Sequence, residues 1–243
     1  TRINRLRQIT IPGSCAVLGL DCPGLPFVFQ CLGQKPNCLT MNSWKGKKIL
    51  VTGISSAIGA VIARALLEKG CEVFGTYRTE KNLHLHFPEI PDGLIPISWA
   101  AHDSPTFLDS SPVFEAWVHC IGAIQPQPIK YLNPKGNQDL FAVNYFSATE
   151  LASKLLSLKK MQRFGSIVFL SSVSSHYPYR GGATYAASKA ALETFSKALA
   201  LECSHLPIRV NSVVCGLIRS TMLDRSVAHL DQNQEDKLLA KYP

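Results

Sequence analysis

The chain has 243 residues, of which 46% are hydrophobic and 17% charged. This length and composition suit one large domain with a buried core and argue against extensive disorder. The 25 Lys and Arg residues outnumber the 17 Asp and Glu residues, and the formal net charge of +8 favours anionic ligands. The basic residues are scattered, which argues against a nucleic-acid partner, and no long apolar run predicts a membrane span.

Residues 1–41 have neither helical nor strand periodicity and carry four of the eight cysteines. We expect an irregular appendage, or sequence upstream of a start at Met41. A targeting peptide is the alternative, but it lacks a clear cleavage site. No Cys-x-x-Cys pair occurs, so reduced thiols in a cytoplasmic protein are expected, and no metal site is predicted.

Short apolar runs alternate with helical patterns along residues 42–243. The patterns predict strands at 47–53, 71–77, 94–100, 115–122, 166–172 and 208–214, and helices at 57–70, 138–160 and 185–203. Residues 102–114 are too short and too proline-rich for a full helix. The alternation predicts one α/β domain with a Rossmann-type, doubly wound parallel sheet, whose ligands bind beyond the carboxyl ends of the strands.

A glycine-containing turn, TGISSAIGA, follows the first predicted strand at residues 52–60. Free backbone N–H groups and the helix dipole converge there, where a pyrophosphate can bind. The expected cofactor-binding residues of the turn are Gly53, Ser55, Ser56, Ala57, Ile58 and Gly59. Two alternatives stay open: a tight turn without a ligand, and a serine-hydrolase elbow with Ser55 as nucleophile, which needs an acid and a histidine downstream.

The second predicted strand ends in Thr76-Tyr77-Arg78, without an acid. An acid at this point would bind the ribose hydroxyls of NAD(H), whereas an arginine can pair with the 2'-phosphate of NADP(H). The sequence therefore favours NADP(H) over NAD(H), with Arg78 as the phosphate partner. A solvated surface arginine is the alternative.

Tyr185 and Lys189 are four residues apart in a predicted helix, so they share one face. An ammonium near a phenol favours the phenolate and lowers its pKa, which suits a general acid/base for a carbonyl/alcohol pair. Ser172 ends the preceding predicted strand, where its hydroxyl can bind a substrate oxygen.

With these motifs, residues 46–222 resemble the short-chain dehydrogenase/reductase family, most closely its 3-oxoacyl carrier-protein reductases. The resemblance implies that Tyr185 passes the proton, Lys189 binds the nicotinamide ribose, Ser172 orients the carbonyl and Asn144 holds a water. It also implies cofactor contacts at Gly122, Tyr185, Lys189, Gly216, Ile218 and Ser220.

The chain departs from the family pattern at two strand ends. His119-Cys120-Ile121 precedes Gly122 where the family has Asn-Asn-Ala, and we expect His119 to be structural. Cys215 stands where a proline usually precedes Gly216, which predicts a looser loop and a buried or gate thiol. Family members also continue into a further helix and a seventh strand, so we expect a truncated domain, and a homo-oligomer if the full C-terminus is present.

These patterns predict an NADP(H)-preferring oxidoreductase that moves a hydride between nicotinamide and a ketone or secondary alcohol, with 3-oxoacyl thioesters as candidate substrates. A cofactor-binding regulator or inactive remnant is the second hypothesis. Substrate contacts are expected in residues 173–184 and beyond Met222; in the first range, His176, Tyr177 and Tyr179 line a pocket or face solvent.

Overall fold

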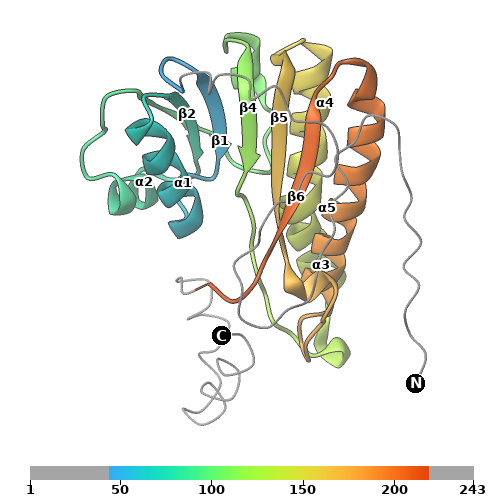
Figure 1. The fold of residues 1–243 in the computed structure, drawn as a ribbon. Coiled ribbons are helices and arrows are strands. Elements are labelled where there is room, and N and C mark those ends of the chain that lie inside the picture. Colours follow the sequence, from blue (N-terminus) through green and yellow to red (C-terminus); the bar gives the residue numbers. More distant parts are fainter. Residues whose placement is uncertain (1–43, 219–243) are drawn as a thin grey trace, which may run out of the picture. The chain divides into compact units, whose positions relative to one another are not determined.

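A computed structural model describes residues 44–218. The predicted domain boundary at residue 42, the appendage before it, Ser220 and the expected truncation all lie outside these residues. The described part forms one six-stranded sheet in the order β3-β2-β1-β4-β5-β6 (Figure 1). Every adjacent pair is parallel. This order is that of the Rossmann dinucleotide-binding fold, so the predicted fold class is confirmed.

The strands lie close to their predicted positions. They are β1 (Lys48–Thr52), β2 (Glu72–Tyr77), β3 (Leu94–Ser98), β4 (Phe114–His119), β5 (Met161–Ser172) and β6 (Arg209–Cys215). Only β5 begins well before its prediction, because Met161 already pairs with Phe114 while the next pair is Ala116 with Ser166. The residues between these pairs bulge outward, with Phe164 at φ 65° and 72% exposed.

The helices differ more from their predictions than the strands do. They are α1 (Ala57–Glu68), α2 (Glu80–His86), α3 (Pro134–Phe141), α4 (Ser147–Ser157) and α5 (Ala183–Glu202). The helix predicted over roughly 138–160 is present from Pro134 to Ser157, but a π turn at Ala142–Phe146, which the sequence did not predict, lies between α3 and α4. The short α2 had no periodic signal, and Thr79 caps it by accepting a hydrogen bond from the N–H of Asn82.

Each face of the sheet packs against its own helices (Figure 1). Leu50 belongs to the cluster formed with α4 and α5, whereas its neighbours Ile49 and Val51 belong to the cluster formed with α1. This alternation follows from the two-residue period of a strand. On the α1 side of β6, no helix within residues 44–218 covers the strand, and Arg209, Asn211 and Val213 are all exposed.

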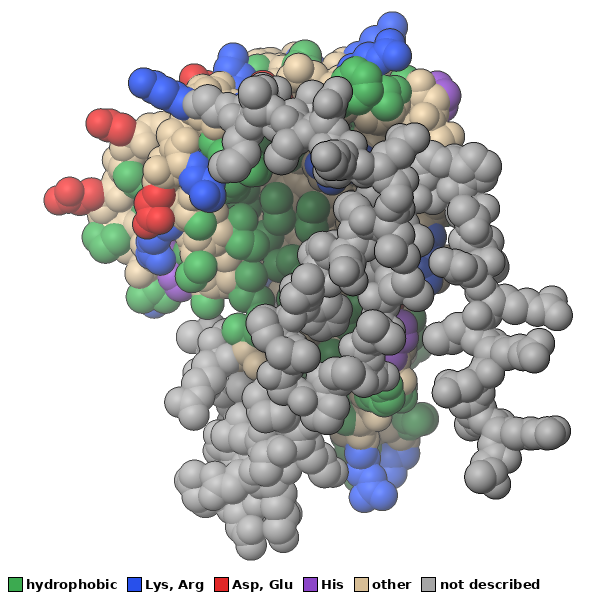
Figure 2. All heavy atoms as spheres, in the orientation of Figure 1, with side chains coloured by type: hydrophobic (Ala, Val, Ile, Leu, Met, Phe, Trp, Pro, Cys, Tyr) green, Lys and Arg blue, Asp and Glu red, His purple; other side chains and the backbone are tan. Residues whose placement is uncertain are grey.

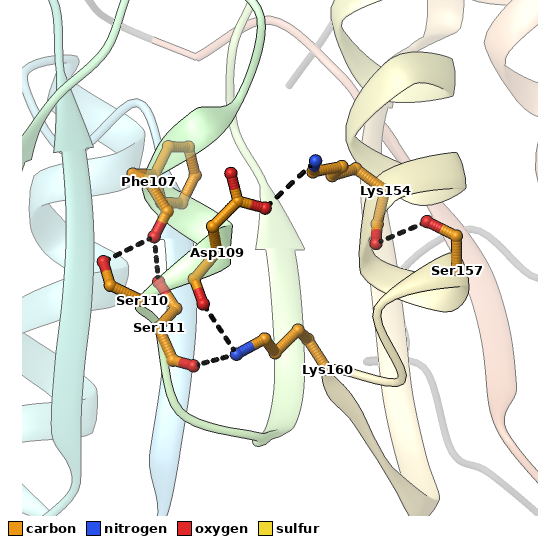
Figure 3. A network of polar contacts seen from close by, with 7 residues as sticks. All are labelled: Phe107, Asp109, Ser110, Ser111, Lys154, Ser157 and Lys160. Carbon is orange, nitrogen blue, oxygen red and sulfur yellow. Dashed lines mark hydrogen bonds and ion pairs between the residues drawn. The ribbon is translucent and has the colours of Figure 1, made fainter.

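The connection from β3 to β4 contains a single 3-10 turn, Thr106–Asp109, instead of a full helix, as the prolines predicted. Leu108 of this turn is fully buried. Two lysines hold the turn (Figure 3): Lys154 of α4, which packs on the same face of the sheet, lies 3.0 Å from the Asp109 carboxylate, and Lys160, between α4 and β5, donates to the Ser111 carbonyl at 2.5 Å. One ion pair and hydrogen bonds to backbone carbonyls thus hold a connection that contains little helix.

Candidate functional site

The turn after β1 is built around Gly53. Its φ of +87° is one that side chains rarely adopt, and a Cβ there would lie 3.1 Å from Ile121. The N–H of Gly53 donates to the side-chain oxygen of Thr76 at 3.0 Å, which ties the turn to β2. Glycine is therefore required here for both conformation and space.

Ser56 caps the N-terminus of α1. Its hydroxyl donates to the Gly53 carbonyl at 2.7 Å and accepts from the N–H of Gly59 at 3.2 Å. A Cβ on Gly59 would lie 2.2 Å from the Gly53 carbonyl oxygen, so the helix can approach the turn this closely only with glycine. Ala57 carries its Cβ at the first helical position, where φ is negative and a side chain is tolerated.

This helix start suits an anionic group. The N–H groups of Ala57 and Ile58 have no acceptor within the helix, because the first turn always leaves its donors free. The first turn of α1 contains no acidic residue that would compete for these donors. The residues present therefore fit the pyrophosphate of a dinucleotide cofactor.

Arg78 directly follows β2 and is exposed. The sequence reading missed a nearby acid: Tyr77 donates a hydrogen bond to the Glu80 carboxylate, which also lies 3.6 Å from His84. The bond to Glu80, with burial, raises the pKa of Tyr77. Glu80 is thus engaged by two partners, while Arg78 is available at the strand end.

Tyr185 and Lys189 lie on α5, and Ser172 ends β5, as predicted. Burial raises the pKa of Tyr185, and a hydrogen bond from Ser172 lowers it by less. The pKa of this phenol is therefore above its ordinary value, opposite to the direction predicted from Lys189. The phenol keeps its proton at neutral pH, which suits a proton donor.

Lys189 is 4% exposed, and its ammonium donates to the Leu170 carbonyl at 2.9 Å. Burial lowers the pKa of Lys189 to about 8, against a smaller opposing effect of the Cys215 and Cys120 thiols. A Cβ on Gly122 would lie 3.3 Å from Nζ of Lys189 and 3.7 Å from Oδ1 of Asn144. A side chain at position 122 would therefore crowd both the Lys189 ammonium and the Asn144 amide, and glycine avoids this.

Asn144 is fully buried in the π turn. Its amide oxygen accepts from the N–H of Ala123 at 2.7 Å, and its amide nitrogen donates to the Ala123 carbonyl and to the Ser188 hydroxyl, both at 2.9 Å. The Ser188 hydroxyl in turn donates to the Tyr185 carbonyl at 2.7 Å. The Asn144 side chain therefore joins the loop after β4 to α5, through a serine that the sequence reading missed although it lies inside YAASK.

His119 ends β4 and is fully buried. Its Nδ1 lies 2.8 Å from the Thr52 hydroxyl oxygen, and its ring packs edge-on against Trp117 and Phe169. Nε2 has no hydrogen-bond partner among residues 44–218. Burial, and to a lesser extent Lys189, lowers the pKa of His119 to about 3, so the ring is neutral and belongs to the core.

The end of β6 brings Cys215 beside the site, because Cys215 pairs in register with Ser172. Burial raises the pKa of the Cys215 thiol, which argues against a nucleophile. Gly216 follows with open space around its Cα, and Ile218 is 42% exposed. Gly216 and Ile218, the two predicted cofactor contacts, therefore follow directly after β6, the strand that ends beside Ser172.

The two tyrosines between β5 and α5 differ in exposure. Tyr177 is 73% exposed and faces solvent. Tyr179 is less exposed, and burial together with the nearby Tyr185 raises its pKa to about 12. Tyr179 is therefore the aromatic residue of this segment that lies nearer the predicted catalytic groups.

Residues 44–218 offer neither a membrane span nor a metal-binding cluster. No helix there is long and apolar enough to cross a membrane. Within the same range, no three His, Cys, Asp or Glu side chains are grouped so that they could hold a metal ion.

Known proteins resemble this chain over most of its length. A protein-family model described as short chain dehydrogenase matches residues 113–231. The 3-oxoacyl-[acyl-carrier-protein] reductase FabG of Salmonella typhimurium is 29% identical over 208 residues, which cover 83% of this chain and 84% of that protein. D-erythrulose reductase of Gallus gallus is 30% identical over 178 residues, covering 70% of this chain and 71% of that one. The crystal structure of BdcA in complex with NADPH matches with a TM-score of 0.67 and 26% identity over 74% of each chain.

Proposed function

This chain belongs to the short-chain dehydrogenase/reductase family, and on that premise we propose that it is an NADP(H)-preferring oxidoreductase acting on a ketone or secondary alcohol. The observation that carries the proposal is a protonated, half-buried phenol, Tyr185, beside the Ser172 hydroxyl and one helical turn from the buried Lys189. These groups lie at the carboxyl edge of the sheet, as does the turn that fits a pyrophosphate.

In the proposed reaction, bound NADPH supplies the hydride. The Ser172 hydroxyl binds the substrate carbonyl oxygen, and Tyr185 donates its proton to that oxygen as negative charge develops on it. The Lys189 ammonium stabilises that charge and holds the cofactor ribose. Asn144 keeps the loop after β4 against α5 by its bonds to Ala123 and Ser188, and the bound water implied by the family stays a proposal.

Tyr185→Phe tests the proposal. We expect the variant to lose NADPH-dependent ketone reduction by about a thousandfold, because general acid catalysis contributes 10²–10⁴-fold, while the Kd for NADPH stays the same. Tyr177→Phe is the matched control, since Tyr177 is exposed, and should keep wild-type turnover. Full activity in Tyr185→Phe would overturn the assignment.

The substrate class is proposed from the relatives. One is named as a 3-oxoacyl-[acyl-carrier-protein] reductase and another as a D-erythrulose reductase, and both names imply a carbonyl. A panel containing a 3-oxoacyl thioester and a ketose separates the two. NADPH binding without turnover on any carbonyl would favour the regulator hypothesis.

Among residues 44–218, Ser55 has no hydrogen bond to a histidine, so nothing in the structure favours a hydrolase.

Location and assembly are proposed from the same basis. We expect a cytoplasmic protein, because reduced thiols suit that compartment, and all four cysteines within residues 44–218 are unpaired. A homo-oligomer is proposed for the full-length protein, and sedimentation velocity would test it.

A further inference from the structure

A carboxylate that the proposed reaction does not use is buried in α5. Glu193 is 6% exposed. One of its oxygens accepts from the Ser171 hydroxyl at 2.5 Å and from the Ser175 hydroxyl, and the other lies 2.9 Å from Nε2 of His176. A buried charge is costly unless it is fully paired, so this arrangement needs all of its donors.

The donors to Glu193 lie on both sides of Ser172. Ser171 precedes it in β5, and Ser175 ends the 3-10 turn Val173–Ser175 that follows it. The Ser175 hydroxyl also lies 2.6 Å from the Ser172 carbonyl oxygen. One carboxylate therefore binds the residue directly before Ser172 and a residue three positions after it.

Glu193 shares α5 with Tyr185 and Lys189. It is one helical turn beyond Lys189, and a helix is stiff over this distance. The three hydrogen bonds thus join the end of β5, which carries Ser172, to the helix that carries Tyr185. The contacts of Glu193 are with Ser171, Ser175 and His176, and not with the glycine turn or the proposed substrate atoms. An effect of Glu193 on the reaction would therefore pass through the position of Ser172.

We propose that Glu193 is a positioning residue that sets the Ser172 hydroxyl against the Tyr185 phenol by binding Ser171, Ser175 and His176. The inference deepens the proposed function and rests on it for its catalytic meaning. Burial would raise the pKa of Glu193, but the hydrogen bonds of Ser171 and Ser175 and the contact with His176 lower it overall, so the carboxylate is ionised and accepts from all three.

The direct test follows the ionisation of Tyr185 by NMR of protein labelled with ¹³C at tyrosine Cζ, with Tyr185→Phe to assign the signal. The Ser172 hydrogen bond lowers the pKa of Tyr185, so Ser172→Ala should raise that pKa. Glu193→Leu should raise the Tyr185 pKa by the same amount, and the variant that combines Ser172→Ala with Glu193→Leu should show no further shift. Glu202→Leu, the same change at an exposed residue of α5, should leave the pKa at its wild-type value.

Glu193→Gln and the double variant Ser171→Ala/Ser175→Ala cover the case in which Glu193→Leu does not fold. The glutamine keeps an acceptor oxygen for the two serines, so it should restore the wild-type pKa of Tyr185. The serine double variant removes the same two bonds from the other side and should raise that pKa. A Tyr185 pKa that moves in Ser172→Ala but stays at the wild-type value in Glu193→Leu and in the serine double variant would overturn the proposal, as would no movement in Ser172→Ala.

The titration requires neither cofactor nor substrate, so its result is independent of whether the protein reduces a ketone. In the active enzyme, Glu193→Leu should lower kcat by the same factor as Ser172→Ala, with the Kd for NADPH unchanged. The variant that combines the two changes should lose no more kcat than either single variant. A merely structural role would lower the melting temperature and leave both the Tyr185 pKa and kcat unaltered.

Discussion

His119 combines complete burial with a ring nitrogen that has no partner among residues 44–218. Its pKa is about 3 in the folded protein and ordinarily about 6.5. Between these pH values the unfolded chain binds a proton that the folded chain does not. Stability therefore falls as the pH decreases through this range, by up to about 1.4 kcal/mol per pH unit from this residue alone.

His119→Phe should remove this part of the acid sensitivity, because phenylalanine fills the ring site between Trp117 and Phe169 and does not titrate. The measurement is the free energy of unfolding in urea at several pH values between about 6.5 and 4. His205→Phe, at an exposed histidine, is the control for the substitution itself. Identical slopes for the wild type and His119→Phe would show that another group carries the acid sensitivity.

Arg78→Asp should move cofactor preference from NADPH toward NADH, because an exposed arginine at the end of β2 can pair with a 2'-phosphate and an aspartate would repel it. A hydrogen bond to a charged group contributes about 1.5–3 kcal/mol, so the ratio of kcat/KM for NADPH to that for NADH should fall about tenfold to a hundredfold. Lys81→Asp makes the same charge change three residues further on and should alter the ratio much less. No change in Arg78→Asp would remove Arg78 from the cofactor site.

Sequence spacing predicted which side chains share α5 but not how they ionise. Tyr185 and Lys189 are four residues apart, and the helix between them is confirmed. The predicted direction of the Tyr185 pKa was wrong, because burial outweighs the other effects and cannot be read from a spacing. Glu193 was missed for a related reason: its bond to Ser171 joins residues that are 22 positions apart, on two different elements.

At the scale of elements, the turn between β1 and α1 offers a matched pair of serines. Ser56 caps α1 through its bond to the N–H of Gly59, whereas no hydrogen bond of the Ser55 side chain is present among residues 44–218. Ser56→Ala should lower the free energy of unfolding by about 1 kcal/mol. It should also weaken NADPH binding, because the helix start would lose its fixed position against Gly53.

Ser55→Ala is the control and should change stability by less than about 0.5 kcal/mol. Urea unfolding and a fluorescence titration with NADPH measure both effects. Equal losses in the two variants would contradict the capping role of Ser56. Loss of an esterase activity in Ser55→Ala would instead support the hydrolase alternative.

The π turn shows where helical periodicity fails as a predictor. Residues 138–160 have apolar spacing that a continuous helix explains, yet the chain inserts a wider turn at Ala142–Phe146. That turn places Asn144 in the interior, against Ala123 and Ser188. The partners of Asn144 come from β4's loop and α5, so a local sequence window contains no sign of them.

At the scale of the whole molecule, alternating strands and helices were sufficient to predict the parallel sheet, because a parallel pair needs a crossover connection. The scattering of basic residues, read from the sequence, agrees with the part of the surface that Figure 2 leaves uncovered, where blue side chains are dispersed. Within the described range, the exposure of Asn211 and Val213 on β6 does not follow from their own sequence pattern, because it depends on which helices pack beside that strand.

The pH dependence of turnover also belongs to the whole molecule, because its groups come from β5, β6 and α5. Tyr185 must be protonated to act as an acid, and its raised pKa keeps it so well above neutral pH. Lys189, with a pKa of about 8, loses its charge first. The kcat/KM for NADPH, which reports ionisations of the free enzyme, should therefore be constant below about pH 8 and fall about tenfold per unit above it.

Lys189→Arg should remove the fall near pH 8, since an arginine stays charged, even if the plateau is lower. Lys197→Arg, at an exposed position of the same helix, should keep the wild-type profile. A midpoint that stays near pH 8 in Lys189→Arg would assign the ionisation to another group beside the site. Cys215 would then be the next residue to replace, because it pairs in register with Ser172 and interacts electrostatically with Lys189.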